Sequence, residues 1–170
     1  MLPRYDIPKA APEPLREVQL LINSVDLHAG TDWIEDWLAE RGLEPEHAAR
    51  ARRLREALRA LVLANNGIEL GADALATVNE EAERVRLRVD ARGSLSVEAG
   101  GDPLDRVVAI ALGAMLDGTF ARLKACRNCH WSFYDYSPNR SATWCSMQIC
   151  GNRRKTRAYR ARKARPSAAG

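Results

Sequence analysis

The sequence lacks several features that would place it in common functional classes. No apolar run approaches the ~20 residues of a membrane span. The first residues have neither the apolar core nor the small-residue cleavage site of a secretory signal. There is no glycine-rich phosphate loop, no nucleophile–base pair and no pair of carboxylates placed for acid–base catalysis. These absences predict a cytoplasmic protein that contacts no membrane and is not an enzyme.

Acidic residues are almost absent after residue 121. The 170 residues carry a net charge of +4 and, with 46% hydrophobic and 28% charged residues, have the composition of a globular protein. Residues 1–121 contain 14 Lys and Arg against 21 Asp and Glu, whereas residues 122–170 contain 12 against one. This asymmetry predicts an acidic body joined to a basic arm, and the usual partner of such an arm is a polyanion.

The spacing of apolar residues predicts a mainly α-helical body with one small β-hairpin. Residues 1–14 hold four of the eight prolines and indicate a flexible leader. Helical spacing predicts four helices, at residues 15–28, 31–42 with Thr31 as N-cap, 45–65 and 74–83. The period then changes to two, which predicts a hairpin at about 84–98. Asp102-Pro103 opens a further helix that we expect to run directly toward Cys126.

All four cysteines lie in a 25-residue window, as Cys126-x-x-Cys129 and Cys145-x-x-x-x-Cys150. Two such pairs can complete a tetrahedron of thiolates around one Zn²⁺. A module of about 40 residues buries too little apolar surface to fold alone, so metal binding would supply its folding free energy. Four protein ligands leave no open position for water or substrate. The pattern therefore predicts one structural Zn²⁺.

Three other uses of these cysteines are alternatives to zinc binding. A thioredoxin-like redox pair is expected beside a βαβ pattern, which the sequence does not show. The run from Cys126 to His130 formally matches a c-type haem attachment motif, but haem would leave Cys145 and Cys150 without a role. An iron–sulfur cluster could use the same four thiolates and stays open at this point. His130 is expected to be a neighbour of the metal rather than a ligand.

A basic segment follows the last cysteine. Residues 151–165 contain no acid and are rich in Ala, Arg and Lys, which are good helix formers. Arg153, Arg157 and Arg160 share one face of such a helix, which the metal would hold where a groove or a phosphate backbone can receive it. Between the cysteine pairs we expect Trp131, Phe133 and Trp144 to pack as the small core of the module, although aromatic side chains can also stack on unpaired bases.

The C-terminal motifs resemble the CGNR zinc finger over about residues 122–165. The residues that carry the resemblance are Trp144-Cys145-Ser146-Met147, Cys150-Gly151-Asn152-Arg153, the first cysteine pair, Phe133, Asp135, Ser137 and Asn139. In that family the finger follows a helical domain called ABATE, which is associated with stress-induced transcription regulation. Residues 21–27 and the arginine-rich third helix resemble the start of that domain.

The resemblance implies a helical N-terminal domain plus a small treble-cleft or ribbon-like zinc module that ends in a basic helix. The expected organisation is a flexible leader at 1–14, an ABATE-like regulatory domain at 15–121, a CGNR-type finger at 122–165 and a tail at 166–170. Carried over by position, the zinc ligands are Cys126, Cys129, Cys145 and Cys150. The expected nucleic-acid contacts are Arg140, Asn152, Arg153, Arg154, Lys155, Arg157 and Arg160.

The loop between the cysteine pairs departs from the family pattern. Pro138, Ala142 and Thr143 stand where arginine is common, so Arg140 is the only cation of this loop. The basic C-terminal helix is therefore expected to make most of the phosphate contacts.

The predicted regulatory body contains three candidate effector contacts. Asn23, Asp26 and Arg55 are candidate contacts for a small effector, with helix-end capping by the first two and a solvated face of Arg52, Arg55 and Arg59 as the alternative. The sequence predicts a zinc-dependent regulator that binds duplex DNA in the bacterial nucleoid, with a body that senses an effector or forms a homodimer. An RNA-binding or ribosome-associated adaptor and a protein-interaction module are the alternatives.

Overall fold

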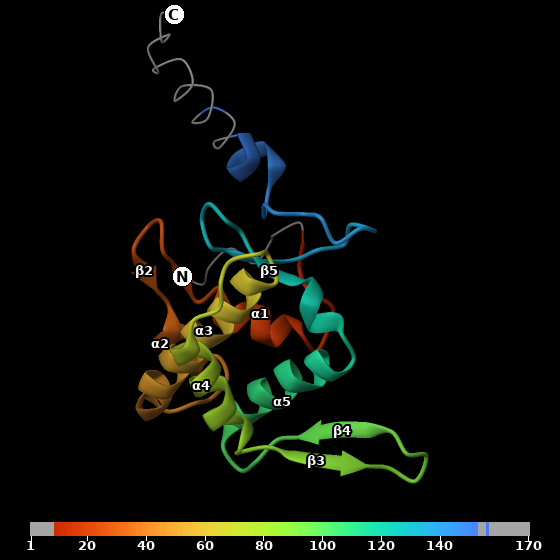
Figure 1. Ribbon diagram of the computed structural model, residues 1–170. Coiled ribbons are helices and arrows are strands. Elements are labelled where there is room, and N and C mark those ends of the chain that lie inside the picture. Colours follow the sequence, from red (N-terminus) through yellow and green to blue (C-terminus); the bar gives the residue numbers. More distant parts are fainter. Residues whose placement is uncertain (1–8, 153–155, 157–170) are drawn as a thin grey trace, which may run out of the picture.

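The computed structural model describes residues 9–152 and 156, and the predicted basic helix at 153–165 lies almost entirely outside them (Figure 1). The helices are α1 (Arg16–Ile22), α2 (Ile34–Ala39), α3 (Ala48–Ala64), α4 (Ala72–Ala82) and α5 (Pro103–Leu116). The strands form three antiparallel pairs: β1 (Val25–Asp26) with β2 (Thr31–Asp32), β3 (Arg86–Val89) with β4 (Leu95–Glu98), and β5 (Leu123–Ala125) with β6 (Ser132–Tyr134). The predicted mainly helical fold is confirmed.

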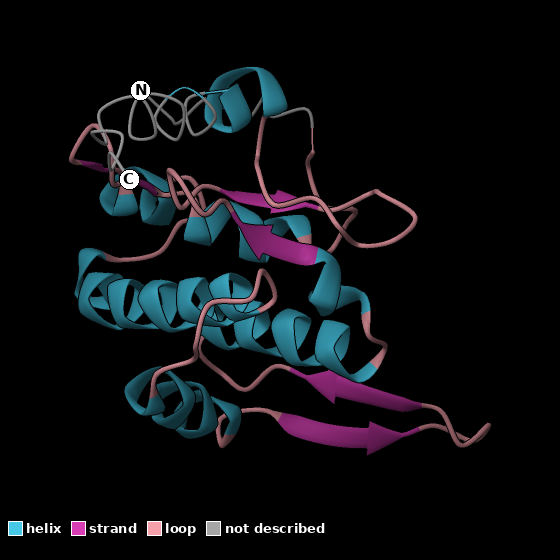
Figure 2. Cartoon of the chain, turned by 45° about the horizontal axis from the view of Figure 1, so that its top comes forward, coloured by secondary structure: helices cyan, strands magenta, loops and turns pink. Residues whose placement is uncertain are grey.

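Helix α3 lies at the centre of the helical layer (Figure 2). It packs against α1, α2, α4 and β5, while α5 packs against α1 and α4. The apolar stripes predicted for α1 and α3 are the faces that enter this core, including Leu21, Leu54 and Leu58. Burying each such side chain contributes about 1.5–3 kcal/mol. No helix in residues 9–152 has both the length and the apolar character needed to cross a membrane.

The first helix ends earlier than predicted, and the following segment is a strand pair rather than helix. Asn23 ends α1, and Val25–Asp26 then pairs with Thr31–Asp32. The Asp26 carboxylate accepts the backbone N–H groups of residues 28 and 29, and Gly30 has φ 69°, a left-handed turn that glycine adopts without strain. Thr31 is therefore not an N-cap, and Asp32 instead accepts the N–H of Ile34 at the start of α2.

The helix predicted to run from Asp102-Pro103 toward Cys126 also stops short of the cysteines. Helix α5 begins as expected at Pro103, behind a capping box formed by Asp102 and Asp105, but it ends at Leu116. Gly118, at φ 79°, turns the chain into a 3₁₀ turn at Thr119–Arg122, and β5 follows directly. The zinc module therefore begins on a strand, not on a continuation of α5. The predicted 45–65 helix likewise starts with a separate 3₁₀ turn at Pro45–His47.

A buried charge network joins three helices at one end of the body. Arg50 on α3 donates to Glu81 on α4 at 2.5 Å and to Asp105 on α5 at 2.5 Å, and lies 2.8 Å from Asp102. Burial of Arg50 opposes its charge, but these carboxylates outweigh that effect and raise its pKa above the usual value. Glu81 is fully buried, and Arg50 is its nearest positive partner at 2.5 Å, ahead of Arg53 at 3.5 Å and Arg84 at 3.7 Å.

Replacing Arg50 with Met should destabilise the fold by about 3–5 kcal/mol, because it leaves the buried Glu81 carboxylate without its main partner. Arg52→Met is the matched control on the same helix, since the Arg52 side chain is 40% exposed and pairs with exposed Glu35. The control should cost less than about 1 kcal/mol. Urea denaturation at pH 7 measures both values, and equal losses for the two variants would refute the proposed role of the network.

Candidate metal centre

The four cysteine sulfurs meet at one point of the structure. The Cys129 Sγ lies 3.6 Å from both Cys145 Sγ and Cys150 Sγ, and the latter two are 3.7 Å apart. All four sulfurs, Cys126 Sγ included, lie within 4.8 Å of one another. Tetrahedral Zn–S bonds of about 2.3 Å place sulfurs about 3.8 Å apart, so the observed separations are those of a zinc tetrahedron. The site fits one structural Zn²⁺ with four thiolate ligands.

Two short turns bring the sulfurs together. The first pair flanks a turn after β5 in which His130 donates its N–H to the Cys126 carbonyl at 2.8 Å and adopts φ 59°. The second pair flanks the turn Met147–Gly151, where the Ser146 hydroxyl accepts the N–H of Ile149 and its carbonyl accepts that of Cys150. His130 is not a member of the sulfur cluster, in agreement with the sequence-based expectation.

The crowding of the thiols makes a cation necessary for their joint ionisation. Hydrogen bonds from Cys129 and Cys145 lower the pKa of Cys126, whereas Cys126 raises the pKa of Cys129 to about 12 and also raises that of Cys145. Cys126, Cys129 and Cys145 therefore cannot all ionise side by side without a positive partner, and Zn²⁺ would supply that charge. The Asn128 side chain donates to Cys150 Sγ at 3.6 Å and helps to orient this ligand.

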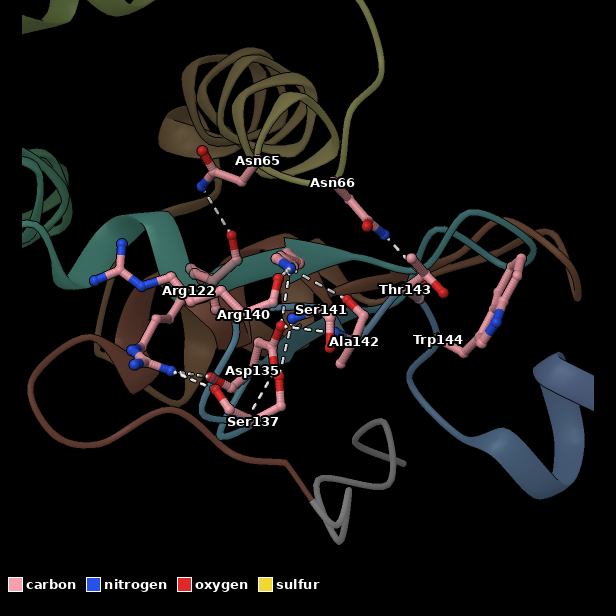
Figure 3. Close-up of polar contacts among 12 residues, drawn as sticks. Asn65, Asn66, Arg122, Asp135, Ser137, Arg140, Ser141, Ala142, Thr143 and Trp144 are labelled. Carbon is pink, nitrogen blue, oxygen red and sulfur yellow. Dashed lines mark hydrogen bonds and ion pairs between the residues drawn. The ribbon is translucent and has the colours of Figure 1, made fainter.

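A buried ion pair holds the loop between the cysteine pairs (Figure 3). Lys124 on β5 donates to the Asp135 carboxylate at 2.8 Å, and the same carboxylate accepts hydrogen bonds from Ser137 and from the N–H of Ala142. Burial alone would raise the pKa of Asp135, but Lys124 and Ser137 outweigh it and hold that pKa at about 2. Lys124 also donates to the carbonyls of Arg140 and Ala142, so the loop is closed from both sides.

Amide side chains of the body attach the zinc module to it. Asn23 at the end of α1 donates to the Ser132 carbonyl at 3.0 Å and accepts the Ser132 N–H at 2.7 Å, as a neighbouring strand would. Gln19 donates to the same carbonyl. Asn66, after α3, donates to the carbonyls of Ala125 and Thr143, which flank the two cysteine pairs (Figure 3). Hydrogen bonds therefore join the zinc module directly to the body.

Two arginines that the sequence placed on a solvated face are buried. Arg55 and Arg59 are each 4% exposed, and only Arg52 of the three lies at the surface. Arg59 donates to the carbonyls of Ile22 and His130, and so joins α1 to the first cysteine turn. Burial lowers the pKa of Arg59. The helical pattern could not reveal the burial of Arg59, because the two backbone carbonyls that it binds are distant in sequence.

The candidate effector residues have partners inside the protein. Asn23 binds Ser132, Asp26 caps its own turn, and Arg55 pairs with Asp32 at 2.7 Å and with the Ser24 hydroxyl. Hydrogen bonds to Asp32 and Glu56 outweigh the effect of burial and raise the pKa of Arg55. Asn23 does end α1, as the capping alternative stated, but its side chain serves the zinc module.

Only two of the expected nucleic-acid residues fall in the described part of the chain. Arg140 is exposed at φ 49° on the loop, and Asn152 is exposed just after the last ligand. Arg153, Arg154, Lys155, Arg157 and Arg160 lie outside the described residues. Among the aromatics, Phe133 is fully buried beside Cys126 and Cys150, which confirms its predicted packing role, and Trp144 packs against the same cluster.

Metal removal should unfold the zinc module and lower the melting temperature of the whole chain, because Leu123, Ala125 and Tyr134 of the module belong to the core of the body. Calorimetry with and without a chelator at pH 7 tests this, alongside elemental analysis for one zinc per chain. Readdition of Zn²⁺ should restore the transition and Mg²⁺ should not. A chelated protein that is metal-free and melts unchanged would contradict the assignment.

Asp135→Asn should cost about 3–5 kcal/mol of folding free energy, because it leaves buried Lys124 without its counter-charge. The Asp135 pKa in the folded protein lies below the ordinary value of 3.8, so the stabilisation is complete above that pH and is lost as the pH falls toward about 2. Asn139→Ala on the same loop is exposed and should change stability by less than about 0.5 kcal/mol. Urea titrations at pH 7 compare the two, and a tolerated Asp135→Asn would refute this role.

Comparison with known families agrees with this geometry. Residues 122–163 match the CGNR zinc finger. Residues 18–122, well over half of the chain, match the ABATE family, described as "Putative stress-induced transcription regulator". Neither is an enzyme family, and no curated protein matches the chain. With four cysteines that fit one structural zinc ion in a CGNR finger behind this helical body, the chain belongs to the ABATE family.

Proposed function

We propose that the protein regulates transcription by binding duplex DNA through its zinc module. The observation that carries the proposal is the charge of this module. Asp135 is the only Asp or Glu in residues 122–170, and it is fully buried against Lys124. The module therefore presents no acidic side chain to solvent, while the sequence supplies 12 Lys and Arg over the same residues. Such a surface attracts phosphates regardless of sequence.

The acidic body has the opposite effect. Residues 1–121 have seven more acidic than basic side chains, so they repel a nucleic acid and restrict its approach to the zinc module. Because Asn23, Asn66 and Arg59 hold the module against the body, the orientation of the DNA-binding surface is set by the body. Among the described residues, Asn152 and Arg140 are exposed and are the proposed DNA contacts, and the basic segment from Arg153 onward would provide most of the phosphate contacts.

The burial of the aromatic side chains favours duplex DNA over single-stranded RNA as the partner. Phe133 is buried, and Trp131 and Trp144 are half buried, so three of the five aromatic side chains between the cysteine pairs offer little free ring surface. Tyr134 is buried as well, and Tyr136 is 61% exposed but donates its hydroxyl to the Ala10 carbonyl. A platform on which successive bases stack needs several free rings.

The body is proposed to receive an effector or a second copy of the chain. A cavity of about 730 Å³ lies between α2, α5 and the segment before α1. Its lining includes Trp37, whose buried indole N–H has no hydrogen-bond partner among the described residues, together with Arg41 and Arg106. Since the side chains of Asn23, Asp26 and Arg55 are engaged within the protein, this cavity is the better place for an effector.

Binding to duplex DNA should weaken steeply with salt. If six to eight cations touch phosphates, log K should fall with log[salt] at a slope of about −5 to −7. Fluorescence anisotropy with a random-sequence duplex measures the slope for the intact chain and for a chain truncated after Asn152, which lacks eight of the 12 cations. The truncated chain should keep its zinc, bind weakly and show a much flatter slope.

The competing functions predict other results in the same assay. Tighter binding of single-stranded RNA than of duplex DNA at equal salt would favour an RNA-binding adaptor. A flat profile for the intact, zinc-loaded chain would remove nucleic-acid binding altogether and leave a protein-interaction module.

A further inference from the structure

The β3–β4 hairpin is an arm with one uncovered apolar face. It projects from the end of the body opposite to the zinc module (Figures 1 and 2). Leu87 pairs with Val97 and Val89 pairs with Leu95, and directly paired residues of an antiparallel ladder lie on the same face. Leu87 and Val89 are each 66% exposed and Leu95 is 50% exposed. Three large aliphatic side chains of this face are therefore open to water.

The other face of the arm is polar. Arg86 pairs with Glu98 and Arg88 with Ser96, and Arg88 forms an ion pair with Glu98 at 3.0 Å. The arm is thus amphipathic, although neither strand has a further strand partner in the described part of the chain. A two-stranded hairpin with an open apolar face is only marginally stable in water, and contiguous exposed apolar surface marks an interaction site.

A groove begins where the arm meets the body. Strand β4 packs on α5, and beside this contact lies a cavity of about 730 Å³. Its apolar lining comes from the arm, from α5 and from the segment before α1, and includes Leu95, Val97, Ile110, Leu116 and Pro14. Leu116 is itself 56% exposed. The apolar face of the arm and the groove therefore form one continuous surface.

The charges of the arm and of the remaining body are opposite. Residues 84–98 contain four arginines and two acids, whereas the rest of residues 1–121 contains ten Lys and Arg against 19 Asp and Glu. Within the arm Arg88 pairs with Glu98, and Arg84 pairs with Glu81 of α4, which leaves Arg86 and Arg92 against Asp90 and keeps the arm net positive. A partner of this surface has to offer both an apolar hollow for the arm and a net negative charge around it.

We propose that the partner is a second copy of this chain, with the arm of each copy seated in the α5 groove of the other. One chain carries both the basic apolar projection and an apolar hollow whose charged lining is Glu13 and Asp117 against Arg106, and such self-complementary surfaces can form a closed twofold interface. A nucleic acid lacks the apolar complement and is repelled by the body. The homodimer considered under the proposed function would form through this surface. Because the arm and the zinc module lie at opposite ends, the dimer leaves both modules accessible.

Sedimentation equilibrium of the zinc-loaded, DNA-free chain tests the interface. The wild-type chain of 18.9 kDa should sediment as a dimer, with dissociation to monomer on dilution. The double variant Leu87→Thr/Val89→Thr removes apolar surface while keeping residues that favour strands, and it should shift the dimer dissociation constant upward by at least about tenfold, since two buried aliphatic contacts are lost. Leu87→Glu should give monomer alone.

Ile68→Thr is the matched control, because it removes exposed aliphatic surface at a residue that lies outside both the arm and the groove. It should leave the dissociation constant within about twofold of the wild type, as expected for an exposed substitution. Zinc content and the melting profile show that each variant remains folded. A wild-type chain that stays monomeric up to near-millimolar concentration, or a dimer that Leu87→Thr/Val89→Thr leaves unchanged, would overturn the proposal. Neither result bears on DNA binding, which the anisotropy assay measures separately.

Discussion

The requirement that four thiolates share one site is the constraint on which the rest of this structure depends. The sulfur separations of 3.6 to 3.7 Å are tolerable for charged ligands only around a divalent cation. Zinc therefore joins two turns that are separated by 15 residues of loop, and the loop itself needs the buried pair of Lys124 and Asp135 to keep its shape. Removal of either interaction leaves charges without partners.

The zinc module and the helical body share one core. Strand β5 packs on α3, and residues from β5 and β6 enter the same core as α1 and α5. Side-chain amides take the place of neighbouring strands: Asn23 satisfies both backbone groups of Ser132, and Asn66 satisfies two carbonyls of the module. In a buried setting these groups would otherwise be costly. Helices α1 and α3 thus contact the zinc module directly, through Gln19 and Arg59.

The distribution of charge separates two surfaces with different partners. The module hides its single acid, while the arm at the far end of the molecule directs its arginines and its aliphatic face outward. Inside the body, Arg50 and Arg55 pair with carboxylates from other elements and Arg59 binds backbone carbonyls of distant segments, so that three basic residues contribute nothing to the attraction of phosphates. The net charge of +4 understates how basic the module is, because the acidic excess of residues 1–121 offsets most of the basic excess of residues 122–170.

Local patterns along the chain were sufficient to predict the zinc ligands, the mainly helical class, the β3–β4 hairpin and the start of α5. The spacing of cysteines, the apolar period and Asp-Pro capping all act over a few residues.

The ends of α1 and α5 were predicted too late in the chain. The turns at Gly30 and Gly118 compete with helical periodicity and are stabilised by hydrogen bonds that the apolar period does not encode. The contacts of Arg59, Asn23 and Asn66 with the zinc module join segments more than 30 residues apart, so local patterns could not predict them. The exposure of Leu87 and Val89 was equally hidden, because it results from the lack of a covering segment. Sequence alone determined which atoms can hold the metal; only the tertiary structure decided what holds the metal-bearing turns in place, because hydrogen-bond partners are chosen by distance in space and not along the chain.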